Sequence, residues 1–221
     1  MSATKLISLR VLPELGQPRF TRAATRARCV ADLIRRGAPE GAWAAERVAV
    51  VFSAQDGDPH PEADGALSVP VAFDLDAWGA MPEPQQRRAA ATALGAALQR
   101  AQRHAGLDPA PAKLAEERAR SRGLVNEQRW RKPAAGPQGR KAQLMYRFEA
   151  EEILVLAQLQ NRRGEPQGEV VITRLPPEES ALDATLGKLS WAGTSGLILE
   201  SRDGQRSLSV NFVGQTLINF R

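Results

Sequence analysis

Acidic side chains gather in one short stretch of the sequence, where Asp56, Asp58, Glu62 and Asp64 fall within nine positions. Carboxylate oxygens are the ligands that hard cations such as Ca²⁺ prefer. Two prolines inside this stretch disrupt the turn of a calcium-binding loop, and no glutamate stands where a bidentate ligand is needed. We therefore expect a solvated loop without a metal, while a hydrolase with a carboxylate-only metal site at Asp56, Asp58 and Asp64 remains an alternative.

Two further acidic groups lack the partners that catalysis requires. Asp74 and Asp76 share one face of a predicted strand, and Glu149, Glu151 and Glu152 cluster near a predicted turn. General acid–base catalysis needs a carboxyl group whose pKa is shifted, and neither group has a histidine or a lysine in apolar surroundings beside it. Both groups are therefore predicted to be surface charge.

Histidine, cysteine and phosphate-binding glycines are too few to build the common catalytic sites. The chain has two histidines, His60 and His104, and a single cysteine, Cys29, which excludes disulfides and cysteine-rich zinc sites. Gly187-Lys188 lacks both the upstream glycine and the following Ser or Thr of a phosphate-binding loop, and no Gly-x-Ser-x-Gly motif occurs. We expect no enzymatic activity, no cofactor and no metal site.

The composition is that of an ordinary globular protein. Of 221 residues, 43% are apolar and 25% are charged, which fits one large domain or two small ones. No stretch of about 18 apolar residues could span a bilayer, and Ser8 and Arg10 interrupt the N-terminal apolar run before a signal-peptide core could form. We expect a cytoplasmic protein with no membrane partner.

Positive charge is concentrated in the middle of the chain. The formal net charge is +5, and the stretch 113–141 holds nine basic residues against three acidic ones, a net of +6. Such a segment could meet phosphates or an acidic protein surface, or it could simply be solvated. The basic residues are Lys113, Arg118, Arg120, Arg122, Arg129, Arg131, Lys132, Arg140 and Lys141.

Hydrophobic periodicity predicts an α+β protein that opens as β-α-β-β-α and continues as an antiparallel β meander. The first half, 1–112, is predicted to hold strands over 4–12, 47–53 and 67–75 and two amphipathic helices over 18–36 and 82–104. Pro70 predicts that the third strand is an edge strand, and Gly106 ends the second helix.

The second half, 141–221, is predicted to follow a basic connector, 113–140, and to form one domain with the first half or a separate one. The connector includes a short helix over 112–122 and a Pro- and Gly-rich linker over 133–139. Alternating apolar residues then predict the following strands, with a short helix over 176–188: 144–148, 153–159, 169–174, 189–191, 197–201, 206–213 and 216–220.

Two sets of residues combine arginine with an apolar side chain, as protein interfaces do. The first is the segment Arg129, Trp130, Arg131 and Lys132, where Trp130 could anchor a partner and the basic residues could donate charge-assisted hydrogen bonds. The second is the outer strip of the first predicted helix, which carries Arg22, Arg26, Cys29, Leu33 and Arg36. The alternative for Trp130, Cys29 and Leu33 is burial within the protein itself.

The chain also resembles bacterial immunity-type proteins of polymorphic toxin systems over about residues 73–150. The resemblance runs from Phe73-Asp74-Leu75-Asp76-Ala77-Trp78 through Pro82-Glu83-Pro84-Gln85-Gln86-Arg87-Arg88 to the Ala-rich helix, then Gly106-Leu107-Asp108, Trp130-Arg131-Lys132 and the strand over 141–148. Immunity proteins are small cytosolic inhibitors that bind and silence a cognate toxin. The basic middle segment implies a toxin with an acidic or neutral face.

The sequence therefore favours a non-enzymatic module that binds another protein, most readily an immunity-type inhibitor that occludes a cognate toxin. The binding residues expected first are Arg129, Trp130, Arg131 and Lys132, followed by Arg22, Arg26 and Leu33. The alternative is a nucleic-acid-binding protein that uses the basic segment 113–141, although the segment contains no named nucleic-acid motif.

Overall fold

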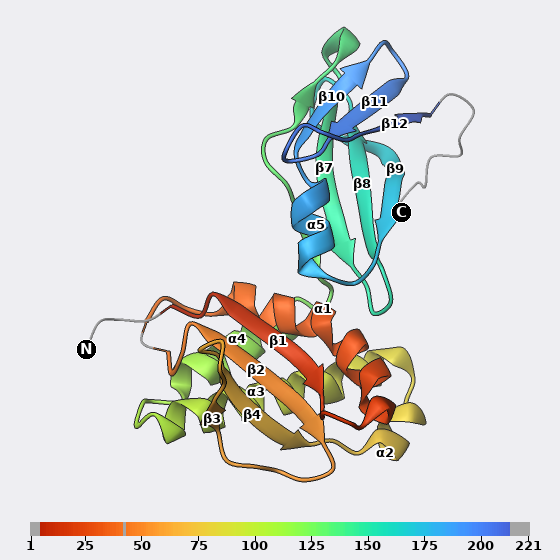
Figure 1. The fold of residues 1–221 in the computed structure, drawn as a ribbon. Coiled ribbons are helices and arrows are strands. Elements are labelled where there is room, and N and C mark those ends of the chain that lie inside the picture. The colour runs from red at the N-terminus through yellow and green to blue at the C-terminus, as the bar shows by residue number, and fades with distance from the viewer. Residues whose placement is uncertain (1–4, 42, 213–221) are drawn as a thin grey trace. The chain divides into compact units, whose positions relative to one another are not determined.

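The computed structural model describes residues 5–41 and 43–212. The chain divides into two compact units, an N-terminal unit, Met1–Asn126, and a C-terminal unit, Glu127–Arg221. Both units contain helices and strands, and the protein has the expected α+β fold (Figure 1). The strand predicted over 216–220 lies outside the described residues.

A mainly parallel sheet forms the base of the N-terminal unit. Its strand order is β1 (Ser8–Pro13), β2 (Arg47–Ser53), β4 (Leu67–Ala72) and β3 (His60–Pro61), with only β3 antiparallel. The register aligns apolar residues in rows across the strands, for example Val11, Val50 and Val69. These three side chains are at most 1% exposed, so the row lies in the core.

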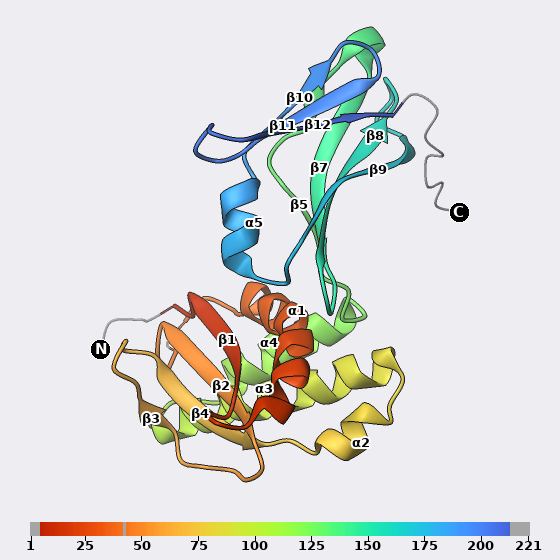
Figure 2. The same ribbon diagram turned by 45° about the vertical axis from the view of Figure 1, so that its right-hand side comes forward.

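Helices cover one side of this sheet. Helix α1 (Thr21–Gly37), which follows the 3-10 turn η1 (Pro18–Phe20), and helix α3 (Glu83–His104) pack on its strands. Helix α4 (Ala110–Ser121) packs on both of them, and the three helices lie on the same side of the sheet in both views (Figures 1 and 2). Among the described residues, no helix has the length and apolar character to cross a bilayer.

The third predicted strand is shorter than expected because a capped helix begins after it. Strand β4 ends at Ala72, and Asp74 Oδ1 accepts a hydrogen bond from Ala77 N at 2.9 Å, which caps α2 (Leu75–Gly79). Asp74 and Asp76 therefore do not share a strand face. Strand β3 pairs with β4 only at Leu67 and Ser68, so Pro70 lies beyond this pairing. The carbonyl of Pro70 points to the same edge of β4 as β3 and accepts a hydrogen bond from Gly57 N. The N–H that proline lacks therefore interrupts no pairing between strands.

Two antiparallel sheets form the C-terminal unit. The first has the order β5 (Glu127–Arg129), β7 (Lys141–Phe148), β8 (Ile153–Gln160) and β9 (Pro166–Leu175), with β6 (Ala134–Ala135) paired to the start of β7. After α5 (Glu179–Thr185), the second sheet has the order β10 (Lys188–Ala192), β11 (Gly196–Glu200) and β12 (Ser207–Asn211). The expected meander is thus divided between two sheets.

The two sheets of the C-terminal unit share one core. Ala142, Ala157 and Leu159 from the first sheet cluster with Leu197 from the second, and Trp191 and Phe212 pack against this cluster. At the margins of the sheets, β12 lies against β9 and β10 lies against β6. The core therefore depends on pairs of strands that are distant in sequence.

The predicted connector, 113–140, is divided between the two units. Helix α4 takes up its first part and packs on α1 and α3, whereas β5 and β6 pair with β7 in the other unit. The proline- and glycine-rich composition of 133–139 indicated a linker, but it accommodates β6 and the 3-10 turn η2 (Pro137–Gly139) instead. The boundary between the units falls after Asn126.

Candidate binding site

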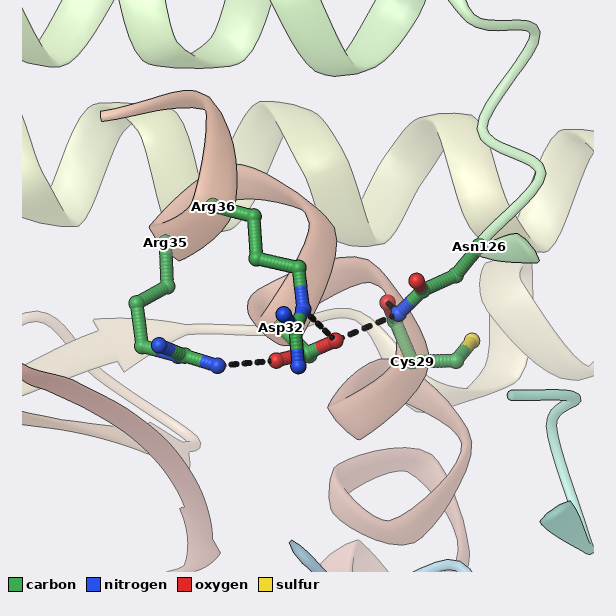
Figure 3. Close-up of polar contacts among 5 residues, drawn as sticks. All are labelled: Cys29, Asp32, Arg35, Arg36 and Asn126. Atoms are coloured by element: carbon green, nitrogen blue, oxygen red, sulfur yellow. Dashed lines mark hydrogen bonds and ion pairs between the residues drawn. The ribbon is translucent and has the colours of Figure 1, made fainter. Parts of the chain in front are cut away.

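A buried ionic cluster lies near the end of α1. Asp32 is only 2% exposed, and its two carboxylate oxygens accept hydrogen bonds from Arg35 at 2.5 Å and Arg36 at 2.8 Å. Asn126 Nδ2 donates to Asp32 Oδ2 and to Cys29 O, each at 2.9 Å (Figure 3). The cluster therefore attaches the last residue of the N-terminal unit to α1.

The partners of Asp32 make it a structural group. Burial by itself would raise the pKa of this carboxyl, but the guanidinium groups of Arg36 and Arg35 and the amide of Asn126 hold the pKa below its usual value. Because both oxygens are occupied and the proton is lost well below neutral pH, Asp32 is poorly suited to act as a general base. Sequence inspection missed this cluster, although the i, i+3 and i, i+4 spacing from Asp32 to Arg35 and Arg36 was a visible signal.

The predicted binding strip on α1 is largely taken up within the fold. Leu33 and Cys29 are each 1% exposed because α1 packs on β1, α3 and α4, so Leu33 cannot contact a partner of the folded protein. Arg26 is half-buried, donates to Gln86 Oε1 at 3.0 Å and lies 6.0 Å from the Trp78 ring. Arg22 and Arg36 of the predicted strip are exposed, and Arg36 donates to Asp32.

The predicted segment 129–132 lies on β5 and the turn after it, in the other unit from the α1 strip. Trp130 is half-buried, and its indole Nε1 donates to Gly187 O at 3.4 Å. Gln143 Nε2 donates to the carbonyls of Trp130 and Arg131, at 3.0 and 3.2 Å. The indole is thus tied to its own unit, while Arg129, Arg131 and Lys132 are exposed.

A polar pocket of about 320 Å³ on the C-terminal unit is lined by a buried carboxyl group, Glu169. Glu169 is 7% exposed, and burial raises its pKa even though Arg147, 3.5 Å away, opposes the shift. Arg147 also donates two hydrogen bonds to Glu127, its partner across β5 and β7. The pocket lining includes no Ser, Thr, Cys or His, and its second carboxyl group, Glu127, is paired with Arg147.

Arginines hold the acidic loop, 56–64. Asp56 pairs with Arg100 at 2.5 Å, and Asp64 pairs with Arg10 at 2.9 Å. In the part of the chain that the structure describes, no three His, Cys, Asp or Glu side chains come together as metal ligands. The loop therefore contributes ion pairs to the N-terminal unit.

A cleft of about 370 Å³ between α3 and the end of α4 is the best candidate site. The arginine cleft, as we call it, combines three guanidinium groups with apolar side chains, which is the composition of a protein interface. Its lining comprises Glu83, Pro84, Arg87, Arg88, Arg120, Gly123, Leu124 and Val125.

The turn after α4 shapes one wall of the cleft. Gly123 adopts a φ of +66°, and the amide of Leu124 returns to Ala119 O at 3.2 Å, a pattern that commonly ends helices. The side chain of Leu124 is buried, with 5% exposed. The carbonyl of Leu124 accepts a hydrogen bond from Arg87 at 3.3 Å. The turn leaves Val125 50% exposed beside the arginines.

The three arginines differ in whether their guanidinium groups are hydrogen-bonded within the protein. Arg87 donates to Glu83 at 2.6 Å, and Arg120 donates to Glu116 at 2.8 Å and to Thr92 at 2.7 Å, so both are held in position. Arg88 is exposed, and no partner for its guanidinium is found among the described residues. A planar guanidinium of this kind binds a carboxylate through two parallel hydrogen bonds.

The charge around the arginine cleft favours an acidic ligand. The charged residues that line it are Arg87, Arg88 and Arg120 against Glu83, an excess of +2.

Sequence signals pointed to parts of this cleft without uniting them. Arg120 belongs to the basic segment, and Arg87 and Arg88 belong to the stretch that resembles immunity-type proteins. Glu83 and Arg87, and likewise Glu116 and Arg120, also have the i, i+4 spacing of ion pairs along a helix, a signal that sequence inspection missed. That the two helices meet at these residues required the tertiary structure.

No protein-family model matches the chain, and neither a curated protein nor a solved structure matches it. The cleft must therefore be interpreted from its own chemistry.

Proposed function

We propose that the protein is a non-enzymatic binding module that seats an acidic segment of another protein in the arginine cleft. The observation that carries this proposal is the exposed Arg88 beside two arginines held by internal hydrogen bonds. Val125 adds an apolar contact at the same place, which favours a protein ligand over a free anion. Binding would act by occlusion, because the cleft offers recognition but no nucleophile.

An immunity-type inhibitor of a cognate toxin is the form of this function that we favour. The resemblance over residues 73–150 supports it, because this stretch includes every residue that lines the cleft. The toxin would present carboxylates to Arg88 and an apolar side chain to Val125. We expect the inhibitor to work in the cytoplasm, where immunity proteins meet their toxins.

Nucleic-acid binding through 113–141 has less support as the main function. Arg118 donates to Gly37 O at 3.0 Å, and Arg120 is bonded to Glu116 and Thr92, so two of its cations serve the fold. The two alternatives differ in a measurable way, since affinity for nucleic acid falls steeply with salt.

Affinity capture from the native host with three forms of the full chain tests the proposal. The forms are wild type, Arg88→Glu, and Arg103→Glu as a matched control, because Arg103 is an exposed arginine at the other end of α3. After nuclease treatment, we expect wild type and Arg103→Glu to retain the same protein, and Arg88→Glu to lose about tenfold or more of it, as loss of a charged hydrogen-bonded contact does.

Two results would count against the cleft. One is retention of the same protein by all three forms, and the other is loss of every captured species after nuclease treatment. Thermal unfolding of each form should stay within a few degrees of wild type, which separates a binding defect from misfolding.

A further inference from the structure

A second charged surface lies at one end of the C-terminal unit and is independent of the arginine cleft. It is built where the start of β7 meets the turn between β8 and β9, since Lys141 pairs with Gln160 in the register of these strands. Both ribbon views place this turn at the same end of the unit as η2 (Figures 1 and 2). We call this surface the basic rim and define it as Arg140, Lys141, Arg162 and Arg163.

Hydrogen bonds between side chains and the backbone hold the basic rim in place. Arg140 donates to Thr194 O at 2.5 Å, and its guanidinium lies 5.0 Å from the centre of the Trp191 ring, which ties the rim to the turn between β10 and β11. Asn161 Oδ1 accepts from Arg163 N at 2.9 Å and from Glu165 N at 3.0 Å, which closes the turn. Lys141, Arg162 and Arg163 are exposed on this ordered backbone, whereas Arg140 is half-buried and supports the surface from below.

Close packing also brings the separate segments of the rim together. At Gly139, whose φ is +76°, an added Cβ would lie 3.0 Å from Arg162 Cγ. A larger residue there would push the Arg162 side chain away, so glycine allows the close approach of the two segments. Arg140 and Arg162 thus belong to one continuous surface although they are far apart in sequence.

The charge of the basic rim is poorly neutralised. Lys141, Arg162 and Arg163 are exposed, and no ion pair to any of them is found among the described residues. The turn between β8 and β9 carries one acidic residue, Glu165, which accepts a hydrogen bond from Asn161 at 2.6 Å. Four cations against one carboxylate leave an excess of +3 on a small surface.

The absence of an apolar anchor separates this surface from the cleft. The large apolar side chains that are exposed in the described part of the chain are Ile7, Leu15, Leu114, Val125 and Leu208, and none belongs to the rim. Protein hot spots usually contain a buried aromatic or apolar anchor, whereas phosphate backbones are bound by clustered Lys and Arg alone. We propose that the basic rim binds the phosphate backbone of a nucleic acid without reading its sequence.

This site differs from the segment 113–141 that the sequence suggested. Only Arg140 and Lys141 of that segment belong to the rim, and Arg162 and Arg163 come from a turn that charge counting did not select. The rim is also separate from the proposed protein-binding site, because all its residues lie in the C-terminal unit.

The test measures binding of the full chain to fluorescently labelled oligonucleotides, one single-stranded and one duplex of about 20 base pairs, at about 50 to 200 mM salt. Three phosphate contacts, from the exposed Lys141, Arg162 and Arg163, predict that log K falls with log salt with a slope of about −2 to −3. Arg162→Gln with Arg163→Gln should reduce that slope by about 2 and weaken binding at low salt by about tenfold or more.

Arg202→Gln with Arg206→Gln is the matched control. It removes the same charge from the same unit, but from the turn between β11 and β12. This turn follows the end of β11, whereas the turn with Thr194, which contacts the rim, precedes the start of β11. We expect this control to bind oligonucleotides as wild type does. Arg88→Glu should also bind them normally, so failure of the cleft proposal and failure of the rim proposal are distinguishable.

Three outcomes would overturn the proposal. The first is no oligonucleotide binding by wild type at low salt, and the second is an equal loss in the rim variant and the control. The third is binding to vesicles of phosphatidylserine and phosphatidylcholine without binding to either oligonucleotide, which would assign the rim to an anionic lipid surface.

Discussion

Asn126 Nδ2 donates a hydrogen bond to Asp32 Oδ2 at 2.9 Å, across 94 positions of sequence. The next residue, Glu127, accepts from Arg147 at 2.7 Å within the C-terminal unit. Asn126 and Glu127 are the two residues at the boundary between the units. The side chain of each one makes a hydrogen bond within its own unit.

Removing the Asn126 amide should weaken the N-terminal unit. Asn126→Ala removes the amide that donates to Cys29 O and Asp32 Oδ2, so that Oδ2 keeps only its hydrogen bond from Arg36, and we expect a loss of about 2 kcal/mol in the free energy of unfolding. Urea unfolding of the full chain measures this loss. Gln85→Ala, at an exposed site on α3, should stay within about 0.5 kcal/mol of wild type. Equal stability of the two variants would contradict a structural role for Asn126.

The contribution of Asp32 should depend on pH. Its pKa is lower in the folded protein than in the unfolded chain, because Arg36, Arg35 and Asn126 outweigh the effect of burial. The unfolded chain therefore takes up the proton first, and the stabilisation is complete above about pH 4 and is lost as the pH falls through the folded pKa. Asp32→Asn should be least stable relative to wild type at neutral pH, and the difference should shrink in acid. A difference that stays constant from pH 7 to pH 3 would rule out this linkage.

Glu169 should behave in the opposite way. Burial raises its pKa above that of the unfolded chain, so its contribution to stability is greatest below the unfolded pKa and declines as the pH rises through the folded pKa. Glu169→Gln should therefore be as stable as wild type or more stable at pH 7, with no advantage below about pH 4. Glu127→Gln, which removes the main partner of Arg147, should lower stability at pH 7. Chemical unfolding across this pH range compares them, and destabilisation by both variants alike at pH 7 would contradict the assignment.

Substitutions of Trp130 and of Arg131 should have different effects on stability. Trp130→Ala removes a half-buried indole that donates to Gly187 O, and we expect unfolding to become easier by about 2 kcal/mol or more. Arg131 is exposed with a φ of +55°, a conformation that glycine adopts without strain, so Arg131→Gly should be neutral or slightly stabilising. Thermal unfolding distinguishes the two. A stable Trp130→Ala protein would return Trp130 to the candidate partner-binding residues.

Local signals in the sequence located most of the helices and strands. Gly106 ends α3 with a φ of +69°, and β2 spans the predicted range 47–53. These signals work because helix ends and strand periodicity depend on neighbouring residues. Asp74 was misassigned for a local reason too, because aspartate is also a strong helix cap and the alternation of Val69, Val71 and Phe73 obscured it.

Pairings between distant segments could not be obtained in this way. The predicted connector was basic and rich in Pro and Gly, yet β5 and β6 within it pair with β7 because that strand offers them open hydrogen-bonding edges. Leu33 lies among the arginines of the strip that was predicted to face outwards, yet it is 1% exposed because α1 packs on β1, α3 and α4.

The sequence by itself determined the α+β class, most of the helices and strands, the excess of positive charge and the lack of common catalytic motifs. The tertiary structure alone decided which charges are committed and which are free. It placed Arg88 beside Arg120 in a cleft, brought Arg162 against Gly139 at the basic rim, and buried Asp32 under Asn126. The physical reason is that charge and periodicity are properties of short segments, whereas burial and ion pairing depend on which distant segments pack together.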